Sequence, residues 1–115
     1  MALKITSREV DGVTVVALDG RIVLGEESSQ LRDAIKGLIA QGKKKIVLDT
    51  DKVTMIDSAG LGIVVGLYSS AKQQGAAMRL CQLGTKFREV LQITKLLTIF
   101  DVYNTEAEAV RSFSK

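Results

Sequence analysis

Apolar positions along the chain alternate between strand-like runs and runs with helical spacing. Two strand-like runs, residues 3–10 and 13–18, flank the dipeptide Asp11-Gly12, which is a strong local signal for a β-hairpin turn. The second run is almost continuously apolar, as is typical of a strand covered on both faces. The pattern therefore predicts an antiparallel strand pair, followed by a loop over residues 19–25.

Helical periodicity follows in four places. Three stripes of mainly apolar residues at i, i+3 and i+4 spacing predict helices, and Gly42 and Gly75 are placed to end the first two. Thr105 and Glu108 have the spacing of a capping box, which predicts a fourth helix near the C-terminus. The stripes are Leu31, Ile35, Leu38 and Ile39; Leu61, Val64, Val65, Tyr68 and Ala71; Phe87, Val90, Leu91 and Thr94; and, facing inward on the fourth helix, Val110 and Phe113.

Short strand-like runs separate the predicted helices, at residues 46–49, 77–81 and 99–103. The resulting order, ββαβαβαβα, predicts a single α/β domain over residues 1–115, with a mixed, mostly parallel sheet and helices packed against it. In such sheets the functional surface lies beyond the carboxyl ends of the strands. The loops that follow the strands are therefore where functional residues are expected.

Composition narrows the chemistry. The chain is 46% hydrophobic and 25% charged, which is ordinary for a globular domain, and no apolar run approaches the roughly 20 residues of a membrane span. It has no histidine, which excludes His-based triads and His-ligated metals, so we expect no enzyme, no metal and no cofactor. The lack of a signal peptide and the single Cys81, expected to be buried and inert, indicate a cytoplasmic protein. The basic run 43–45 has no interleaved aromatic residues, so no direct nucleic-acid binding is expected.

The loop after the third predicted strand contains Asp57-Ser58-Ala59-Gly60-Leu61-Gly62. Ser58 falls where the second helix should begin, and its hydroxyl is suited to cap that helix. Asp57 is an alternative cap, or a charge that complements the helix dipole. Gly60 and Gly62 are poor helix formers, which indicates close approach by another backbone or by a partner.

Together with the element order, this run resembles the signature of the STAS family, the anti-sigma factor antagonists. The resemblance covers nearly the whole chain and includes Gly20-Arg21 and residues 90–96. It implies that Ser58 is phosphorylated by an anti-sigma factor that is itself a serine kinase. It further implies that the unmodified protein, a monomer when free, binds that kinase and frees a sigma factor, and that a serine phosphatase resets the switch.

One position departs from the family pattern. Many members carry an aspartate three residues after the loop glycine, where this chain has Val23. Glu26 and Glu27 are predicted in the first turn of a helix and are poor substitutes for that carboxylate. Either the kinase differs in its facing residues, or Ser58 is phosphorylated less readily.

The predicted contact surface combines the start of the second helix with the loop over residues 20–24. Exposed Leu24, Met55 or Ile56 would supply its apolar centre. Thr54 is the second candidate for phosphorylation, ahead of Ser28, Ser29 and Thr50, and solvent-facing roles are expected for these four residues. The full predicted surface is Gly20, Arg21, Val23, Leu24, Met55, Ile56, Asp57, Ser58, Ala59, Gly60 and Leu61.

Two alternative functions remain open from the sequence. Asp49, Asp51 and Asp57 all lie at or after the third strand, and clustered carboxylates suit Mg²⁺, as in a phospho-aspartate receiver. A receiver normally presents an acidic pair after its first strand, whereas Asp19 stands alone. The other alternative is a STAS-type scaffold of another regulatory or transport assembly, in which Ser58 only caps its helix.

Overall fold

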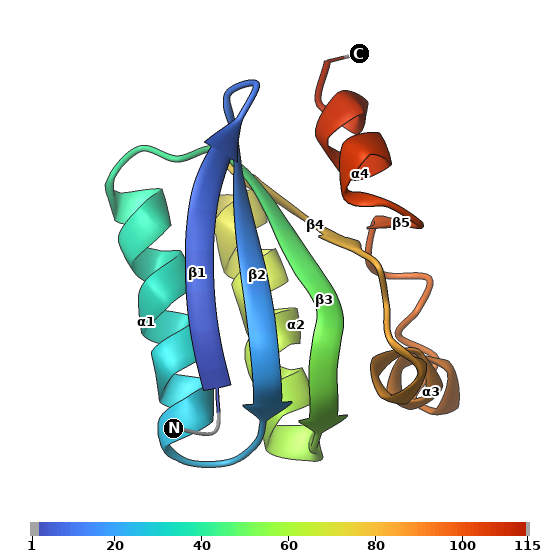
Figure 1. Cartoon of the computed structure of the whole chain (residues 1–115). Helices are drawn as coiled ribbons and strands as arrows, with labels where there is room; N and C mark the ends of the chain where they lie inside the picture. The colour runs from blue at the N-terminus through green and yellow to red at the C-terminus, as the bar shows by residue number, and fades with distance from the viewer. Residues whose placement is uncertain (1–2, 115) are drawn as a thin grey trace.

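The computed structural model describes residues 3–114, which form a five-stranded sheet flanked by helices (Figure 1). The strands lie side by side in chain order, with β1 antiparallel to β2 and every later pair parallel. The predicted α/β class and the element order are therefore confirmed. The strands are β1 (Leu3–Val10), β2 (Val13–Ile22), β3 (Lys45–Ile56), β4 (Ala77–Cys81) and β5 (Val102–Tyr103).

The β1–β2 turn has the backbone conformation that its sequence predicts. Asp11 and Gly12 have φ angles of 51° and 80°, and this pair of positive values suits the right-handed twist of a two-residue hairpin. Strand β2 then carries alternating buried side chains toward both faces of the sheet. Val16 and Leu18 belong to one core cluster, and Val13 and Val15 belong to another.

Two layers of helix cover these two faces. The larger core packs α1 (Glu26–Ala40), α2 (Ser58–Gln73) and α3 (Thr85–Ile93) against the sheet. The smaller core packs α4 (Glu106–Ser112) against the opposite face, over the first halves of β2 and β3. None of the helices within residues 3–114 has the length and apolar character needed to cross a membrane.

Helix α4 begins with the predicted capping box. The Thr105 hydroxyl accepts a hydrogen bond from the Glu108 amide at 3.1 Å, and the Glu108 carboxylate accepts one from the Thr105 amide at 3.2 Å. Val110 is buried as predicted. Phe113 is half-buried, and the Arg79 guanidinium lies 4.0 Å from the centre of its ring.

Several predicted boundaries are wrong. Strand β2 continues to Ile22 and β3 to Ile56, because the two strands stay paired through register shifts after Ala17 and Gly20. The last residues of these strands include exposed polar side chains. The apolar pattern in the sequence therefore ends before the last hydrogen-bonded residue of each strand. Strand β5 covers only Val102–Tyr103, since residues 96–99 form a turn. Thr94 lies one residue beyond α3 and is exposed.

Candidate functional site

The carboxyl ends of β2 and β3 lie together, next to the first turns of α1 and α2 (Figure 1). Ser58 is the first residue of α2, and its side chain is exposed. The predicted capping role of Ser58 is wrong, because the Asp57 side chain caps the helix. Its Oδ1 accepts a hydrogen bond from the Gly60 amide at 2.8 Å. The Ser58 hydroxyl therefore stands at the start of a helix without serving as its cap.

Asp57 also holds the preceding loop in place. Its Oδ2 accepts a hydrogen bond from the Leu24 amide at 2.9 Å, and its own amide donates to the Ile22 carbonyl at 3.3 Å. The amides of Leu24 and Gly60 stabilise the charged carboxylate and lower the pKa of Asp57 below its ordinary value. The site consequently carries a fixed negative charge beside Ser58.

Gly60 is required by the packing of α2 against β2. A Cβ atom at this position would lie 1.9 Å from the Ile22 carbonyl oxygen. The predicted close approach of another backbone is therefore confirmed at Gly60. Gly62 differs, because a Cβ there would have no atom within 4 Å. Internal packing does not explain the second glycine.

The predicted contact surface is partly exposed and partly internal. Leu24 is 76% exposed and Met55 is 50% exposed, so both are available to a partner. Ile56 is buried at 7%, because side chains alternate along β3 and this one points into the core. Its predicted exposure is wrong. Gly60 and Leu61 are also buried, so they position the surface rather than form it.

The remaining predicted surface residues lie around this centre. Arg21 is exposed at the end of β2, with its Nη2 3.9 Å from the Glu27 Oε2 in the first turn of α1. Gly20, Val23 and Ala59 are half-buried. The exposed part of the predicted surface is therefore Arg21, Leu24, Met55 and Ser58, with Asp57 half-buried among them.

The other candidate hydroxyl groups differ in accessibility. Thr54 is exposed and donates a hydrogen bond to the Gly20 carbonyl at 3.2 Å. Ser28 and Thr50 are buried, and their hydroxyls bond to backbone carbonyls, including that of Cys81 at 3.3 Å from Thr50. Their predicted solvent-facing roles are wrong, because each satisfies a carbonyl next to a strand end. Ser29 is half-buried.

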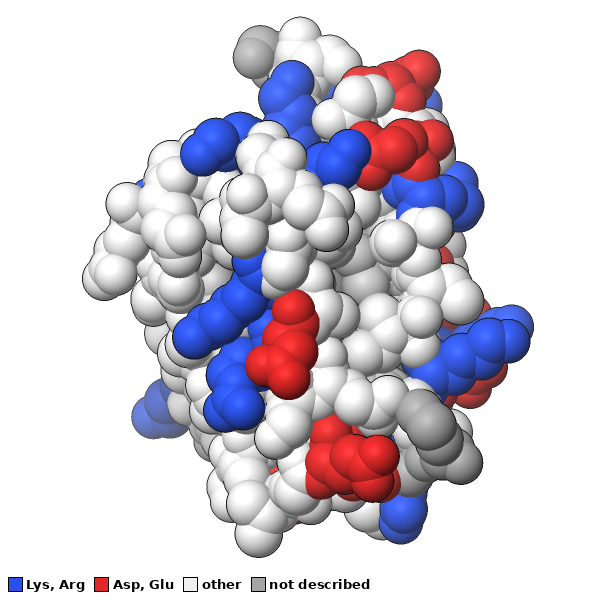
Figure 2. All heavy atoms as spheres, turned by 90° about the vertical axis from the view of Figure 1, so that its left-hand side faces the viewer, with Lys and Arg blue, Asp and Glu red and all other residues white. Residues whose placement is uncertain are grey.

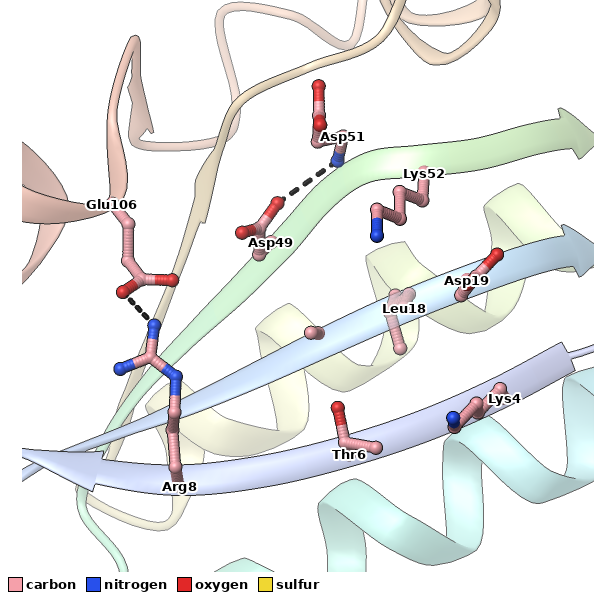
Figure 3. Close-up of a pocket in the computed structure, with 10 residues that line it drawn as sticks. Lys4, Thr6, Arg8, Leu18, Asp19, Asp49, Asp51, Lys52 and Glu106 are labelled. Atoms are coloured by element: carbon pink, nitrogen blue, oxygen red, sulfur yellow. Dashed lines mark hydrogen bonds and ion pairs between the residues drawn. The ribbon is translucent and has the colours of Figure 1, made fainter.

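A hollow of about 300 Å³ lies away from Ser58, between β1, β2, β3 and the start of α4. Figure 3 shows Asp49 and Asp51 here, with Glu106 paired to Arg8. The Asp49 carboxylate accepts the Asp51 amide at 3.1 Å, and burial raises its pKa above the ordinary value.

Asp57, the third aspartate of the proposed Mg²⁺ cluster, is not among the residues that line this hollow. It directly follows the last residue of β3, and the amides of Leu24 and Gly60 hold it there, whereas Asp49 and Asp51 lie in the middle of the strand. Among residues 3–114, no three His, Cys, Asp or Glu side chains are arranged to hold a metal ion. The structure thus separates the carboxylates that the receiver hypothesis would bring together.

Cys81 faces the smaller core and is buried. Burial, together with the nearby charge of Asp49, raises the pKa of its thiol to about 12. The thiolate that would react as a nucleophile is therefore scarce at neutral pH, as expected for an inert cysteine.

Comparison with known proteins identifies the family. The STAS domain model matches residues 4–109, which is nearly the whole chain. The chain belongs to the STAS domain family. The domain is 31% identical to BtrV of Bordetella bronchiseptica, whose name describes it as a provisional anti-sigma factor antagonist, over 96% of this chain and 95% of BtrV.

Solved structures share the fold of this STAS domain. An anti-sigma factor antagonist from Mycobacterium paratuberculosis superposes with a TM-score of 0.84 at 23% identity, over 98% of this chain and 95% of that one. The Bacillus cell fate determinant SpoIIAA, solved in its phosphorylated form, superposes with a TM-score of 0.74 at 23% identity, over 96% and 99% of the two chains. The second comparison shows that this fold is found in a phosphorylated protein.

Proposed function

We propose that this STAS domain is an anti-sigma factor antagonist that works in the cytoplasm as a binding protein rather than as an enzyme. Its unphosphorylated form binds an anti-sigma factor and frees a sigma factor. Phosphorylation of Ser58 by that anti-sigma factor, a serine kinase, ends the binding, and a serine phosphatase restores it. The observation that carries the proposal is the exposed Ser58 hydroxyl at the start of α2, next to the ionised carboxylate of Asp57.

The geometry allows Ser58 to gain a phosphate without loss of the fold. A phosphoserine adds about −1.5 to −2 charges at neutral pH. The N-terminus of a helix stabilises negative charge through its dipole and its free amides. Since the side chain is exposed, no buried group must move to admit the phosphoryl group. Stability should therefore change little.

Binding, in contrast, should change strongly. The new charge lies beside Asp57, so the site becomes strongly negative over a short stretch of surface. A partner that docks there must desolvate this charge or place its own groups against it, and like charges at an interface are strongly unfavourable. The modification therefore controls binding through charge and leaves the core unchanged.

Apolar residues take the place of the aspartate that many family members carry after the loop glycine. Val23 stands at that position and is half-buried, whereas Leu24 next to it is 76% exposed. Leu24 and the exposed Met55 give this surface an apolar centre. We infer that the cognate anti-sigma factor presents apolar side chains here, rather than a basic side chain that would pair with an aspartate.

The proposal is tested by phosphorylation and by binding. The anti-sigma factor that copurifies with the wild-type protein is identified, produced separately and incubated with ATP and with each variant. Intact mass should show one added phosphate on the wild type and none on Ser58→Ala. In titrations, Ser58→Asp should bind the same partner at least tenfold more weakly than the wild type.

Thr85→Asp is a matched control, since Thr85 is also an exposed hydroxyl residue at the first position of a helix. It should bind as the wild type does. If intact mass shows the same added phosphate on the wild type and on Ser58→Ala, the phosphorylated residue is not Ser58. Thr54→Ala would then be the next variant to measure. Unchanged affinity of Ser58→Asp would refute the switch and leave a scaffold without a phosphate cycle.

A further inference from the structure

A groove of about 170 Å³ runs between α1 and α2 on the outer side of the larger core. We call it the α1–α2 groove. Its floor includes Ile63 and Leu67, which are half-buried and buried. Arg32 and Lys36 line it from α1, and Gly62, Gly66 and Ser70 line it from α2.

Packing within the domain does not explain why glycine occupies positions 62 and 66 in the groove. Gly60 is fixed by the Ile22 carbonyl, but a Cβ at Gly62 or at Gly66 would have no atom within 4 Å. Both glycines lie inside α2 and are exposed. Glycine is a poor residue for a helix interior, where alanine would fit and would favour the helix. The space above these two residues is therefore free for a group that is not part of this domain.

The groove continues the surface that contains Ser58. Gly62 lies four residues after Ser58, and Gly66 lies eight residues after Ser58. Residues four apart are neighbours on one side of a helix. A partner segment that contacts the exposed start of α2 can therefore continue along the same side of α2. The missing side chains at Gly62 and Gly66 let its backbone approach α2 closely.

The basic side chains that line the groove indicate that its occupant carries acidic groups. Arg32 and Lys36 are four residues apart on α1, so both point to the same side of that helix and line the groove. Figure 2, which faces the α1 side of the molecule, shows basic side chains running down the middle of that side, with acidic ones beside them. Asp33 is an acidic neighbour of Arg32 in the sequence, and its Oδ1 lies 3.7 Å from the Arg32 Nε, but Asp33 does not line the groove.

We propose that the α1–α2 groove seats an amphipathic helix of the partner, with small apolar residues over Gly62 and Gly66 and carboxylates facing Arg32 and Lys36. This rests on the proposed function and names a second part of the surface that the anti-sigma factor binds. It also connects the groove to the switch. A phosphate on Ser58 lies one helical turn from Gly62, where it repels the carboxylates of the seated helix.

The test uses the paired effects of glycine substitutions on stability and on binding. Gly66→Ala should raise the melting temperature of the free domain and weaken binding of the unphosphorylated domain to the purified anti-sigma factor severalfold. Gly66→Leu, which fills the groove, should weaken binding more than tenfold. Gly37→Ala is the control, because a Cβ at Gly37 also meets no atom within 4 Å and this residue does not line the groove. It should raise the melting temperature and leave affinity unchanged.

Charge reversal gives a second, independent readout. Arg32→Glu and Lys36→Glu alter side chains at the surface, so the fold should remain, and the double variant should bind at least tenfold more weakly. This loss should shrink at high salt. Wild-type affinity of both Gly66→Leu and the double variant would overturn the proposal. A concentration-dependent dimer that Gly66→Leu abolishes would also overturn it, since the occupant would then be a second copy of this chain.

The two proposals fail in different ways. If Ser58→Asp loses binding while the groove variants keep it, the switch stands and the groove is not part of the interface. If Ser58→Asp binds normally, the proposed function falls whatever the groove variants do.

Discussion

The Leu24 amide donates a hydrogen bond to the Asp57 carboxylate at 2.9 Å, and this bond joins the loop after β2 to the start of α2. The same carboxylate accepts the Gly60 amide with its other oxygen. One side chain therefore fixes the relative position of Leu24, an exposed apolar residue, and Ser58, the proposed phosphoacceptor. The proposed contact surface is therefore already fixed in the free domain.

Asp57→Ala should destabilise the domain measurably, because the Gly60 amide loses the acceptor that the N-cap supplies. It should also weaken partner binding, because the Leu24 loop loses its attachment to α2. Urea unfolding and titration with the anti-sigma factor measure the two effects. Asp19→Ala, at an exposed acid in β2, is the control and should leave both values near those of the wild type. Unchanged stability of Asp57→Ala would contradict the capping role.

The contribution of Asp57 should depend on pH. Its pKa in the folded state lies below the ordinary value of 3.8, so the folded state binds this proton less readily than the unfolded state does. The stabilisation is therefore complete above the ordinary value and is lost as the pH falls through the lower folded-state pKa. The stability difference between the wild type and Asp57→Ala should be constant from pH 7 to about pH 5 and shrink below it. Urea unfolding across this range checks the trend.

The charge of Asp49 should lower the stability of the folded domain, whereas the charge of Asp57 raises it. Burial raises its folded-state pKa above 3.8, so its ionised form is less favourable in the folded than in the unfolded state. Asp49→Asn keeps an oxygen to accept the Asp51 amide and removes the charge. It should stabilise the domain at pH 7, and the gain should fade as the pH falls and the wild-type carboxyl becomes protonated. A loss of stability at pH 7 would contradict this account.

Two glycines two residues apart should respond in opposite directions to alanine. Gly60→Ala places a Cβ 1.9 Å from the Ile22 carbonyl oxygen, so α2 must move and the domain should lose roughly 1–3 kcal/mol or more. Gly62→Ala meets no atom within 4 Å and should gain roughly 1 kcal/mol through better helix propensity. Thermal unfolding of both variants measures the contrast. Destabilisation of similar size in both would show that Gly62 has a packing role inside the domain.

Leu24→Ser and Met55→Ser should weaken partner binding without unfolding the domain. Both side chains are at least half exposed, so stability should change by no more than about 0.5 kcal/mol. Each affinity should fall about tenfold, which corresponds to roughly 1.4 kcal/mol. Ile93→Ser is the matched control, since Ile93 is 80% exposed at the end of α3. Equal effects of all three substitutions would show that exposed apolar surface in general, rather than this site, determines binding.

Local sequence rules predicted the fold well where a few neighbouring residues decide the structure. Asp11-Gly12 forms the hairpin turn and Thr105 with Glu108 forms the capping box, since both depend on short-range backbone geometry. The ends of β2 and β3 were not predictable in this way. Polar residues continue these strands because each strand is hydrogen-bonded to the other, and no single strand contains that information.

The sequence predicted that the loop after β2 and the start of α2 lie together, but it did not predict all the contacts between them. Asp57 and Ser58 are both good N-cap residues and adjacent in the chain, so sequence does not decide which one caps α2. The structure selects Asp57, because its second oxygen also reaches the Leu24 amide. The burial of Ile56 depends on the register of β3 against β2, which has two shifts before that residue. Gly66 was not singled out from the sequence, although its spacing of four residues from Gly62 was the available signal for the α1–α2 groove.

The strands occur in the sheet in the same order as in the chain. During synthesis, each new strand can therefore pair with the strand made just before it. No strand needs a partner from a distant, later part of the chain. Contacts between segments close in sequence also favour rapid folding. The sheet can therefore assemble by successive addition at one edge, and the strands that flank the loop with Ser58 all precede the last third of the chain.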